Sequence, residues 1–241
     1  MGKITILDET SSHPIQLIGK VSGICDGSDI ANEVKNYKRG LDCLENNHGR
    51  TLESVDIYMI LEGYSAKTVR EFYTHIGGSP MRLQSSTRYI DYEKKGVPVI
   101  TPPSIANKES AKKAWDETIE AIKTGMNKLK ALEIPNEDVT NLLPLAYQSK
   151  MVWKVNLRTL INFMNKRLCS RAYWEIRQLS NEIKKLVSEY SEEWRQIADW
   201  LFVPYCERYK FINHDFCFCT ESKGCGRHPN IKDLKIVSKT E

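Results

Sequence analysis

The sequence contains no apolar run of about 18 residues or more, so no segment is long enough to indicate a membrane-spanning helix. The N-terminal segment MGKITILDETSSHP lacks the apolar core of a signal peptide, because charged residues interrupt it almost at once. We therefore predict a cytoplasmic protein whose seven cysteines are most simply reduced thiols.

Charge of one sign is also scarce, since the net charge is only +4. This value is compatible with an anionic small ligand and too small to indicate a nucleic-acid-binding protein by itself. The sequence has no Walker loop, no GxGxxG fingerprint, no GxSxG elbow and no HExxH motif. It also lacks internal repeats and a linker rich in Pro, Gly or Ser, so we expect one domain.

The composition is that of an ordinary globular protein, with 41% hydrophobic and 27% charged residues. Apolar spacings of three and four predict helices near 30–45 and 107–132, and a long helix that ends near Leu201. Residues 3–7 and 55–61 are the clearest strands, Glu62-Gly63 is expected to turn the chain, and Ser65 is expected to cap a helix that reaches His75. Long helices around a few short strands indicate an α/β (α+β) class.

The segment from Asn156 to Arg177 is unusually rich in hydrogen-bonding side chains for a core helix. On a helix, Arg158, Asn162 and Asn165 share a face, while Arg167 falls nearly opposite Asn162. One interpretation is an amphipathic helix with a solvated cationic face. The other is a ligand site, in which Asn amides bind a heterocycle and Arg binds an anion, and which needs pockets on two sides or a subunit interface.

A second polar cluster follows the glycine loop 76–80, whose glycines permit close approach of the backbone to a ligand. The cluster consists of Arg82, Gln84, Ser85, Ser86, Thr87, Arg88 and Tyr89. Hydroxyls and an arginine at such a turn are typical of a phosphate-binding loop, and a polar surface loop is the alternative. Each of His75 and His48 fits either a structural or a ligand-contacting role.

The C-terminal tail contains a cysteine-rich pattern, which allows three interpretations: a structural cysteine cluster, a zinc site or a redox pair. The candidate zinc ligands are Cys217, Cys219, Cys225 and His228. A zinc site needs four ligands at preferred spacings, and CxC is not the usual spacing. We therefore favour the structural cluster and assign no metal ligand.

Taken together, these features resemble the flavin-dependent thymidylate synthases, from about residue 15 to residue 227. LPL at 143–145, Asn156-x-Arg158-xxx-Asn162-xxxx-Arg167 and AYWEIR at 172–177 resemble the LPL…NxRxxxNFxxxR…AQWEIR block of that family. His48 is similar in position to a histidine that precedes the first central strand, and LEGYS at 61–65 resembles the family's IEGxS segment.

The resemblance to the family signature, RHRxxSxNExSxRY, is partial. His75, Ser86, Arg88 and Tyr89 match it. Thr74 and Ile76 replace its arginines, Gln84 replaces its acid, and about two extra residues lie in the glycine loop. Thr140 stands where the family has an arginine, and Arg171 stands where many members have a histidine. The pattern is that of a divergent branch in which the Asn156 block is intact.

The resemblance implies reductive methylation of dUMP to dTMP, with FAD as the redox cofactor and NADPH and 5,10-methylenetetrahydrofolate as co-substrates. It also implies a single domain over 1–241 with a small, mostly antiparallel central sheet flanked by long helices and a cysteine-rich tail, 204–241. The family forms homotetramers whose active sites are built from several subunits. Neither nucleic acid nor membrane is expected as a partner.

By the same resemblance, each candidate site residue receives a role. The dUMP-binding residues would be Gln84, Ser85, Ser86, Thr87, Arg88 and Arg167, and the FAD-contacting residues would be Arg50, His75, Asn156, Arg158 and Asn162. His48 would lie near the flavin and folate rings. Arg167 is the predicted catalytic residue, because a permanently cationic guanidinium can stabilise negative charge on the pyrimidine and make C5 more nucleophilic.

Two other functions were weighed against this one. The altered segment Thr74-His75-Ile76 favours a related flavin-dependent methylase of another pyrimidine nucleotide, such as UMP. A zinc-stabilised tail favours a non-catalytic binding protein. Bound flavin without zinc would exclude the second of these.

Overall fold

The computed structural model describes residues 2–78, 80–90, 92 and 96–234. The described chain forms two compact units. Unit 1 takes its residues from 1–5, 60–74 and 81–153, and unit 2 from 6–59, 75–80 and 154–241. The chain passes between the units several times, and three of these boundaries fall inside strands.

A four-stranded sheet has the order β1-β2-β4-β3. Its strands are β1 (Lys3–Ile6), β2 (Asp56–Ser65), β4 (Gln148–Asn156) and β3 (Met81–Gln84). β2 alternates buried and half-buried residues over most of its length, as expected for a strand with one face in the core. It continues through Glu62 and Gly63, so the predicted turn there is wrong. Gly63 has φ +71°, a backbone conformation that glycine adopts inside a strand without a steric penalty.

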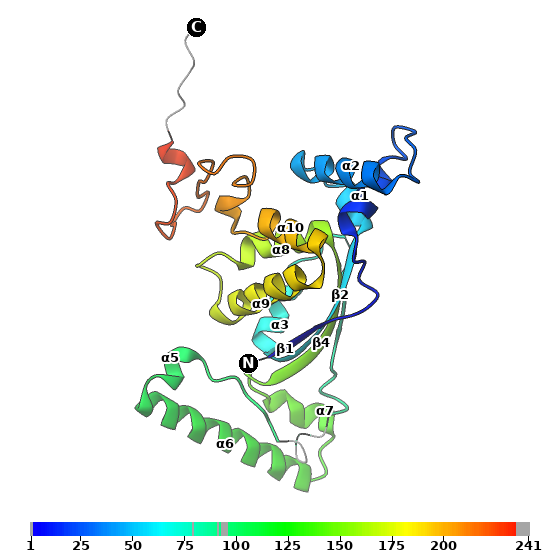
Figure 1. Ribbon diagram of the computed structural model, residues 1–241. Coiled ribbons are helices and arrows are strands. Elements are labelled where there is room, and N and C mark those ends of the chain that lie inside the picture. Colours follow the sequence, from blue (N-terminus) through cyan, green and yellow to red (C-terminus); the bar gives the residue numbers. More distant parts are fainter. Residues whose placement is uncertain (1, 79, 91, 93–95, 235–241) are drawn as a thin grey trace. The chain divides into compact units, whose positions relative to one another are not determined.

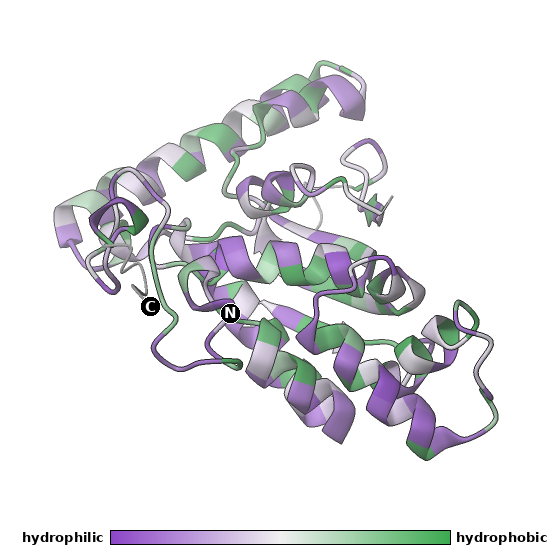
Figure 2. Cartoon of the chain, turned by 90° about the horizontal axis from the view of Figure 1, so that it is seen from above, coloured by the Kyte–Doolittle hydropathy of each residue, from purple (hydrophilic) through white to green (hydrophobic). Residues whose placement is uncertain are grey.

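The helices of unit 1 are α3 (Ala66–Phe72), α5 (Pro103–Ala106), α6 (Glu109–Ala131), α7 (Asn136–Val139) and the 3₁₀ turn η2 (Thr140–Leu142). The predicted cap of α3 is confirmed, because the Ser65 side chain accepts a hydrogen bond from the Thr68 N–H. The helix ends at Phe72, short of His75. The helices carry hydrophilic and hydrophobic residues in alternation, as the colouring of Figure 2 shows.

Unit 2 holds the other helices that the structure describes. They are α1 (Pro14–Ser22), α2 (Glu33–Glu45), α8 (Leu157–Arg167), α9 (Trp174–Tyr190), α10 (Glu192–Leu201) and the 3₁₀ turns η1 (Thr51–Ser54), η3 (Tyr205–Glu207) and η4 (Ile231–Asp233). α1 packs on α2, and α9 packs on both α8 and α10 (Figure 1). Large apolar side chains of α8, α9 and α10, such as Phe163, Ile183 and Trp194, are fully buried.

The predicted long helix is in fact interrupted. α8 ends at Arg167, and Ser191 separates α9 from α10. Ser191 has an extended backbone with φ −157°, and its side chain accepts a hydrogen bond from the Trp194 N–H at 3.2 Å. It therefore acts as the N-cap of α10. The apolar period continues across this break, which is why periodicity alone predicted one helix.

The observed mixture of helices and a small antiparallel sheet confirms the predicted α+β class. Among the described residues, no helix has both the length and the apolar character needed to cross a membrane. The single domain with a tail at 204–241 stays a prediction, and residues 235–241 of that tail lie outside the described residues.

Candidate functional site

The segment from His75 to Gly78 lies along α8 and contacts both ends of this helix. The Thr159 hydroxyl, in the first turn, donates a hydrogen bond to the Gly77 carbonyl at 2.5 Å. Arg167, the last residue of the helix, donates from Nε to Nε2 of His75 at 3.1 Å. Between these contacts, the His75 ring packs edge-on against Phe163, with ring centroids 4.9 Å apart. The segment and the helix therefore form one structural element.

Gly78 is required for this arrangement. Its φ is +66°, and a Cβ atom there would overlap the side-chain amide of Asn156. Asn156 is the N-cap of α8: its Oδ1 accepts a hydrogen bond from the Thr159 N–H at 2.9 Å. A side chain at position 78 would thus strain the backbone and also disturb a helix cap.

The contact between Arg167 and His75 fixes the chemistry of both groups. Because His75 Nε2 accepts a hydrogen bond, this nitrogen carries no proton in the observed geometry. His75 is 7% exposed and Arg167 is half-buried. An arginine is cationic at any relevant pH, so the contact holds a fixed positive charge at the C-terminal end of α8.

Two clefts of unit 2 share the polar residues of α8. The first, here called the Arg158 cleft, has a volume of 490 Å³. Its lining comprises Leu44, Glu45, Asn47, Gly49, Arg50, Leu52, Arg158, Ile161, Asn162, Asn165, Leu201, Tyr205, Arg208, Tyr209, Phe211 and Ile212. The sequence-based prediction that Arg158, Asn162 and Asn165 share one face of a helix is confirmed by this lining.

Glu53 holds the two arginines of the Arg158 cleft in place. Arg158 Nη1 lies 2.7 Å from Glu53 Oε1, and Arg50 Nη1 lies 3.3 Å from Oε2 of the same carboxylate. A Cβ atom at Gly49 would lie 3.1 Å from Arg158 Nε, so the absence of a side chain there gives the guanidinium room. Sequence reasoning missed Glu53, although an acid three residues after Arg50 was a usable signal.

Aromatic rings form another part of the Arg158 cleft. The Arg208 guanidinium lies 3.7 Å from the centroid of the Tyr205 ring and 4.5 Å from that of Tyr209. Phe211 also lines the cleft. The cleft thus combines three guanidinium groups, three side-chain amides and flat apolar surfaces.

The second cleft, here called the Arg167 cleft, has a volume of 790 Å³. It is lined by Asn162, Asn165, Lys166, Arg167, Cys169, Arg171, Ala172, Tyr205, Cys206, Cys219, Thr220 and Glu221. Asn162 and Arg167 therefore line one cleft, although they are five positions apart in the sequence. Because Arg167 ends the helix, the cleft can extend around the helix terminus, so these two residues need neither of the predicted arrangements, pockets on two sides or a subunit interface.

Asn165 lines both clefts but has a structural role. Its Nδ2 donates hydrogen bonds to the carbonyls of Leu201 and Val203, at 2.9 and 2.8 Å. Both amide hydrogens are thereby used to hold the chain that follows α10. Asn162, in contrast, is an exposed residue of α8.

The predicted phosphate-binding loop lies in unit 1 and is attached to β4. Gln84 Nε2 donates to Ser149 Oγ at 2.9 Å, and Ser85 Oγ accepts from the Lys150 N–H at 3.3 Å. Ser86 Oγ accepts from the Arg88 N–H at 3.3 Å. These bonds fix a compact turn in which hydroxyl groups lie close together.

Arg88 forms an ion pair at the surface of unit 1. Its Nε lies 2.8 Å from Glu137 Oε2, and both side chains are more than half exposed. Asn136 Nδ2 donates to the Thr87 carbonyl at 3.0 Å and secures the same turn. An anion that binds Arg88 must therefore compete with the Glu137 carboxylate.

His48 is exposed in the turn after α2, where its N–H donates to the Cys43 carbonyl at 2.9 Å. Its neighbours Asn47 and Gly49 line the Arg158 cleft, whereas His48 is not among the described lining residues. His48 is therefore adjacent in sequence to two lining residues, but it is not itself part of the described lining.

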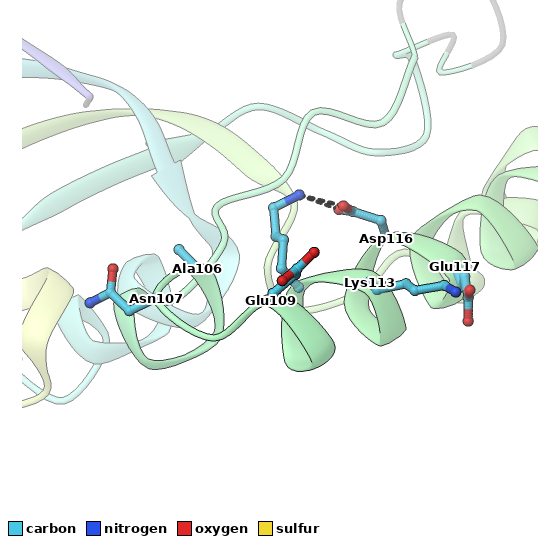
Figure 3. A pocket seen from close by; sticks show the side chains of 7 residues that line it. Ala106, Asn107, Glu109, Lys113, Asp116 and Glu117 are labelled. Carbon is cyan, nitrogen blue, oxygen red and sulfur yellow. Dashed lines mark hydrogen bonds and ion pairs between the residues drawn. The ribbon is translucent and has the colours of Figure 1, made fainter.

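Unit 1 has a further pocket, of 550 Å³, at the start of α6 (Figure 3). Charged side chains dominate its lining, and Lys112 forms an ion pair with Asp116. None of the predicted site residues lines it. An open pocket of paired charges without an aromatic wall gives no reason to place a flavin or a pyrimidine there.

The predicted zinc ligands of the tail are not brought together as a set. Among the described residues, the one group of metal-binding type consists of Cys206, Glu207 and His228. Of the four candidates only His228 belongs to it. Burial, together with the charge of Glu207, raises the pKa of the Cys206 thiol to about 11. This thiol is protonated at neutral pH, which argues against a role as a free redox thiolate.

Comparison with known proteins now identifies the family. The model of the family described as thymidylate synthase complementing protein matches residues 6–191, which is most of the chain. The chain belongs to this family. Its relatives include a flavin-dependent thymidylate synthase of Nitratidesulfovibrio vulgaris, 29% identical over 211 residues that cover 83% of this chain and 81% of the relative. Another, from Pyrococcus abyssi, is 33% identical over 203 residues, 80% of this chain and 78% of the relative.

A solved structure has the same fold. It is that of a UMP/dUMP methylase, PolB, from Streptomyces cacaoi bound with 5-Br dUMP, with a TM-score of 0.66 and 14% sequence identity. The similarity covers 84% of this chain and 97% of that one. At this identity the similarity establishes the fold alone.

The family is one of flavoprotein methyltransferases, so it implies FAD as cofactor and NADPH and 5,10-methylenetetrahydrofolate as co-substrates. The residues of the Arg158 cleft fit an FAD group. Arginine forks bind phosphate oxygens, amides hydrogen-bond heterocycles and aromatic rings stack on flat ligands. Gly49, beside Arg158, leaves the space that such a ligand and its guanidinium partner need.

Proposed function

We propose that the protein methylates dUMP reductively to dTMP, with 5,10-methylenetetrahydrofolate as carbon donor and FAD, reduced by NADPH, as hydride source. Family membership supports the class of reaction. The observation that carries the assignment within this chain is the Arg167–His75 contact, which holds a guanidinium in a cleft of 790 Å³.

Arg50, Arg158 and Asn162 are proposed to hold FAD, because they line one cleft and the guanidinium groups are pre-positioned by Glu53. His75 and Asn156 are assigned to the same cofactor, and His48 to the vicinity of the flavin and folate rings. The bound flavin supplies hydride transfer, which no side chain of the protein can perform.

Arg167 is proposed to bind the uracil ring and stabilise its N3-deprotonated form. Negative charge on the pyrimidine makes C5 more nucleophilic toward the one-carbon unit. His75 contacts the guanidinium at Nε and helps to fix its orientation. The reaction then requires no cysteine nucleophile.

Gln84, Ser85, Ser86, Thr87 and Arg88 are proposed to bind the phosphate and sugar of dUMP. Hydroxyls and an arginine fork in a compact turn are suited to phosphate oxygens. Both side chains of the Arg88–Glu137 pair are more than half exposed, so the pair contributes little and a phosphate can displace the Glu137 carboxylate.

The test of cofactor binding is the visible spectrum of the purified protein, followed by FAD titration of the apoprotein. The wild type should show flavin absorbance and take up FAD. Arg158→Ala should bind FAD at least about tenfold more weakly, since a charge-assisted bond to phosphate contributes about 1.5–3 kcal/mol. Arg195→Ala, which removes an exposed arginine paired with Glu192, is the control and should bind normally.

A colourless protein that takes up no FAD would contradict the proposal. So would an Arg158→Ala variant with wild-type affinity, which would remove the cleft from the cofactor site.

The second candidate function is methylation of UMP. The segment Thr74-His75-Ile76 motivates it, because this segment departs from the family signature. Product analysis after parallel incubation with dUMP and UMP separates the two substrates. Methylated product from UMP alone would replace the first proposal.

We also infer a homotetramer with intersubunit active sites, formed by a single domain over 1–241, from family membership. Light scattering of the purified protein tests this assembly. A monomer at concentrations where dTMP is formed would contradict it.

A further inference from the structure

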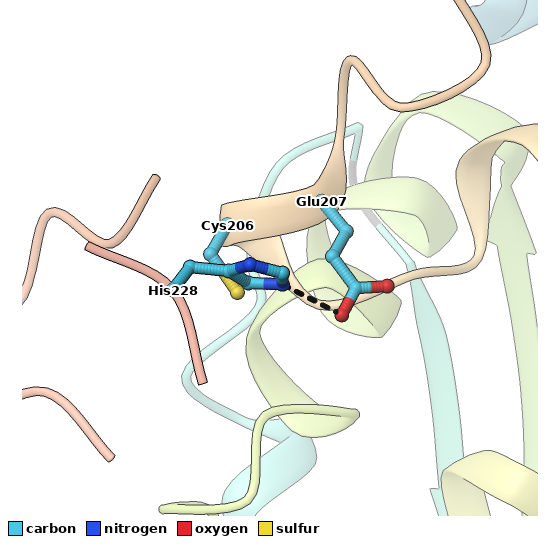
Figure 4. A group of neighbouring side chains, drawn as sticks. All are labelled: Cys206, Glu207 and His228. Atoms are coloured by element: carbon cyan, nitrogen blue, oxygen red, sulfur yellow. Dashed lines mark hydrogen bonds and ion pairs between the residues drawn. The ribbon is translucent and has the colours of Figure 1, made fainter. Parts of the chain in front are cut away.

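Cys206, Glu207 and His228 bring three different metal-binding side chains together in the tail of unit 2 (Figure 4). Their ligand atoms, a thiol sulfur, a carboxylate oxygen and an imidazole nitrogen, all lie within 4.8 Å of one another. Glu207 and His228 are mostly buried, with side-chain exposures of 15% and 22%. The group lies beyond residues 6–191, which match the family model.

The spacing of these atoms suits a tetrahedral cation. His228 Nε2 lies 3.1 Å from Glu207 Oε1. Two such ligands, each bound to zinc at about 2.0–2.2 Å, would lie about 3.3 Å apart at a tetrahedral angle. The sulfur lies within 4.8 Å of both other ligand atoms, so it can complete the face of a tetrahedron.

We propose that Cys206, Glu207 and His228 bind one zinc-class divalent cation, with the fourth position left to water. A thiolate and an imidazole select a borderline metal over magnesium or calcium, which prefer oxygen ligands alone. This set contains Cys206 and none of the cysteines of the predicted zinc pattern. The CxC spacing of Cys217 and Cys219 therefore has no bearing on it.

The cation would join two segments of the tail that are far apart in sequence. Backbone hydrogen bonds already connect both segments to residues 218–219. The Phe218 N–H donates to the Cys206 carbonyl at 3.1 Å, and the Cys219 N–H donates to the Pro229 carbonyl at 2.8 Å. Because Tyr205 and Cys206 line the Arg167 cleft, metal binding would fix part of that cleft's wall. The role of the metal is thus to hold two parts of the tail together within unit 2, apart from the chemistry of the flavin.

Arg227 is the group that competes with a cation. Its Nη1 lies 3.2 Å from the Glu207 oxygen that also meets His228. Burial raises the pKa of the Glu207 carboxyl, but the hydrogen bond from His228 and the charge of Arg227 outweigh burial and hold the pKa below its usual value. The Arg227 side chain is 48% exposed, so it can turn toward solvent when a cation takes its place.

The experiment uses the full-length protein without an affinity tag. After treatment with a chelator, the protein is given zinc, and bound metal is measured by mass spectrometry. X-ray absorption at the zinc edge should show one sulfur at about 2.3 Å and nitrogen or oxygen ligands at about 2.0–2.2 Å. Cobalt substitution should give a thiolate-to-metal charge-transfer band.

Variants identify the ligands. Cys206→Ser, Glu207→Gln and His228→Ala should each weaken zinc binding by at least about tenfold. The matched controls are Cys217→Ser, Glu221→Gln and His214→Ala, which change the same residue types outside the group and should bind zinc normally. Circular dichroism verifies that each variant is folded.

Wild-type protein that binds no zinc, or zinc without a sulfur ligand, would overturn the proposal, as would normal binding by Cys206→Ser. These readouts do not depend on flavin or on dTMP formation. Zinc bound without methylase activity would therefore refute the proposed function and support the metal site. Methylase activity without bound zinc would support the proposed function and refute the metal site.

Discussion

Arg167 donates a hydrogen bond from Nε to Nε2 of His75 across a distance of 3.1 Å. The two residues are 92 positions apart in the sequence, and each lies at the end of a segment that the other helps to fix. This contact gives the guanidinium a defined direction in the Arg167 cleft. It also explains why His75 is retained although both of its neighbours differ from the family signature.

Replacement of Arg167 tests its catalytic role. Arg167→Ala should lower the rate of dTMP formation by at least about 100-fold, since a preorganised charge that stabilises a developing anion commonly contributes this much. FAD should remain bound, because Arg167 is not among the described residues that line the Arg158 cleft. Steady-state kinetics and the flavin spectrum of the same sample measure both effects.

The control for Arg167 is Lys185→Ala, which removes a 75% exposed cation of α9 and should leave the rate unchanged. Arg167→Lys retains the charge but loses the planar fork and should still lose most activity. A fully active Arg167→Ala variant would remove this residue from the mechanism.

Gly78→Ala should destabilise the protein more than an ordinary glycine substitution. The new Cβ atom would meet the Asn156 amide and also strain a backbone at φ +66°. Gly27→Ala is the matched control, because Gly27 has φ +67° with no atom within 4 Å of its Cβ position. The strain alone costs about 1–2 kcal/mol, and urea denaturation should show a clearly larger loss for Gly78→Ala. Equal losses would mean that the segment does not press on α8.

Asn156 has two separable roles. Asn156→Ser retains a good N-cap, so its free energy of unfolding should stay close to the wild-type value, whereas Asn156→Ala should lose about 1 kcal/mol. Both variants lack the amide, and both should bind FAD more weakly if Nδ2 contacts the cofactor. Wild-type FAD affinity in Asn156→Ser would reduce the residue to a helix cap.

Arg88→Ala should raise the KM for dUMP about tenfold or more and change kcat little, because a phosphate contact contributes to binding in both the ground and transition states. Arg82→Ala is the comparison. Arg82 Nη1 donates to the Phe72 carbonyl at 3.0 Å and its guanidinium lies over the Tyr73 ring, so its loss should affect stability and leave KM unchanged. An unchanged KM in Arg88→Ala would argue against a phosphate site in this loop.

Local signals in the sequence predicted much of the fold. The Ser65 cap, the α6 helix and the shared face of Arg158 and Asn162 all depend on residues within one or two turns of each other. The start of α2 was less well predicted, since Asn32 caps the helix at Glu33 and not near residue 30. The helix break at Ser191 was missed because the apolar period continues from α9 into α10.

Contacts between distant segments were beyond local reasoning. Glu53 binds Arg158 across 105 positions, and neither residue carries a sign of the other. Cys206 and Glu207 meet His228 through the folding of the tail, whereas a spacing pattern directed attention to Cys217, Cys219 and Cys225. For the candidate site, the sequence indicated which residue types take part, and the tertiary structure showed which residues contact one another.

The central claim is that this chain converts dUMP to dTMP with reduced flavin. The most direct measurement is a quenched reaction in which the purified protein, loaded with FAD and reduced by NADPH, receives dUMP and 5,10-methylenetetrahydrofolate. We predict that dTMP accumulates, that its formation requires both the folate and the reductant, and that Arg167→Ala forms almost none. A flavin-loaded wild-type protein that leaves dUMP unchanged would contradict the account.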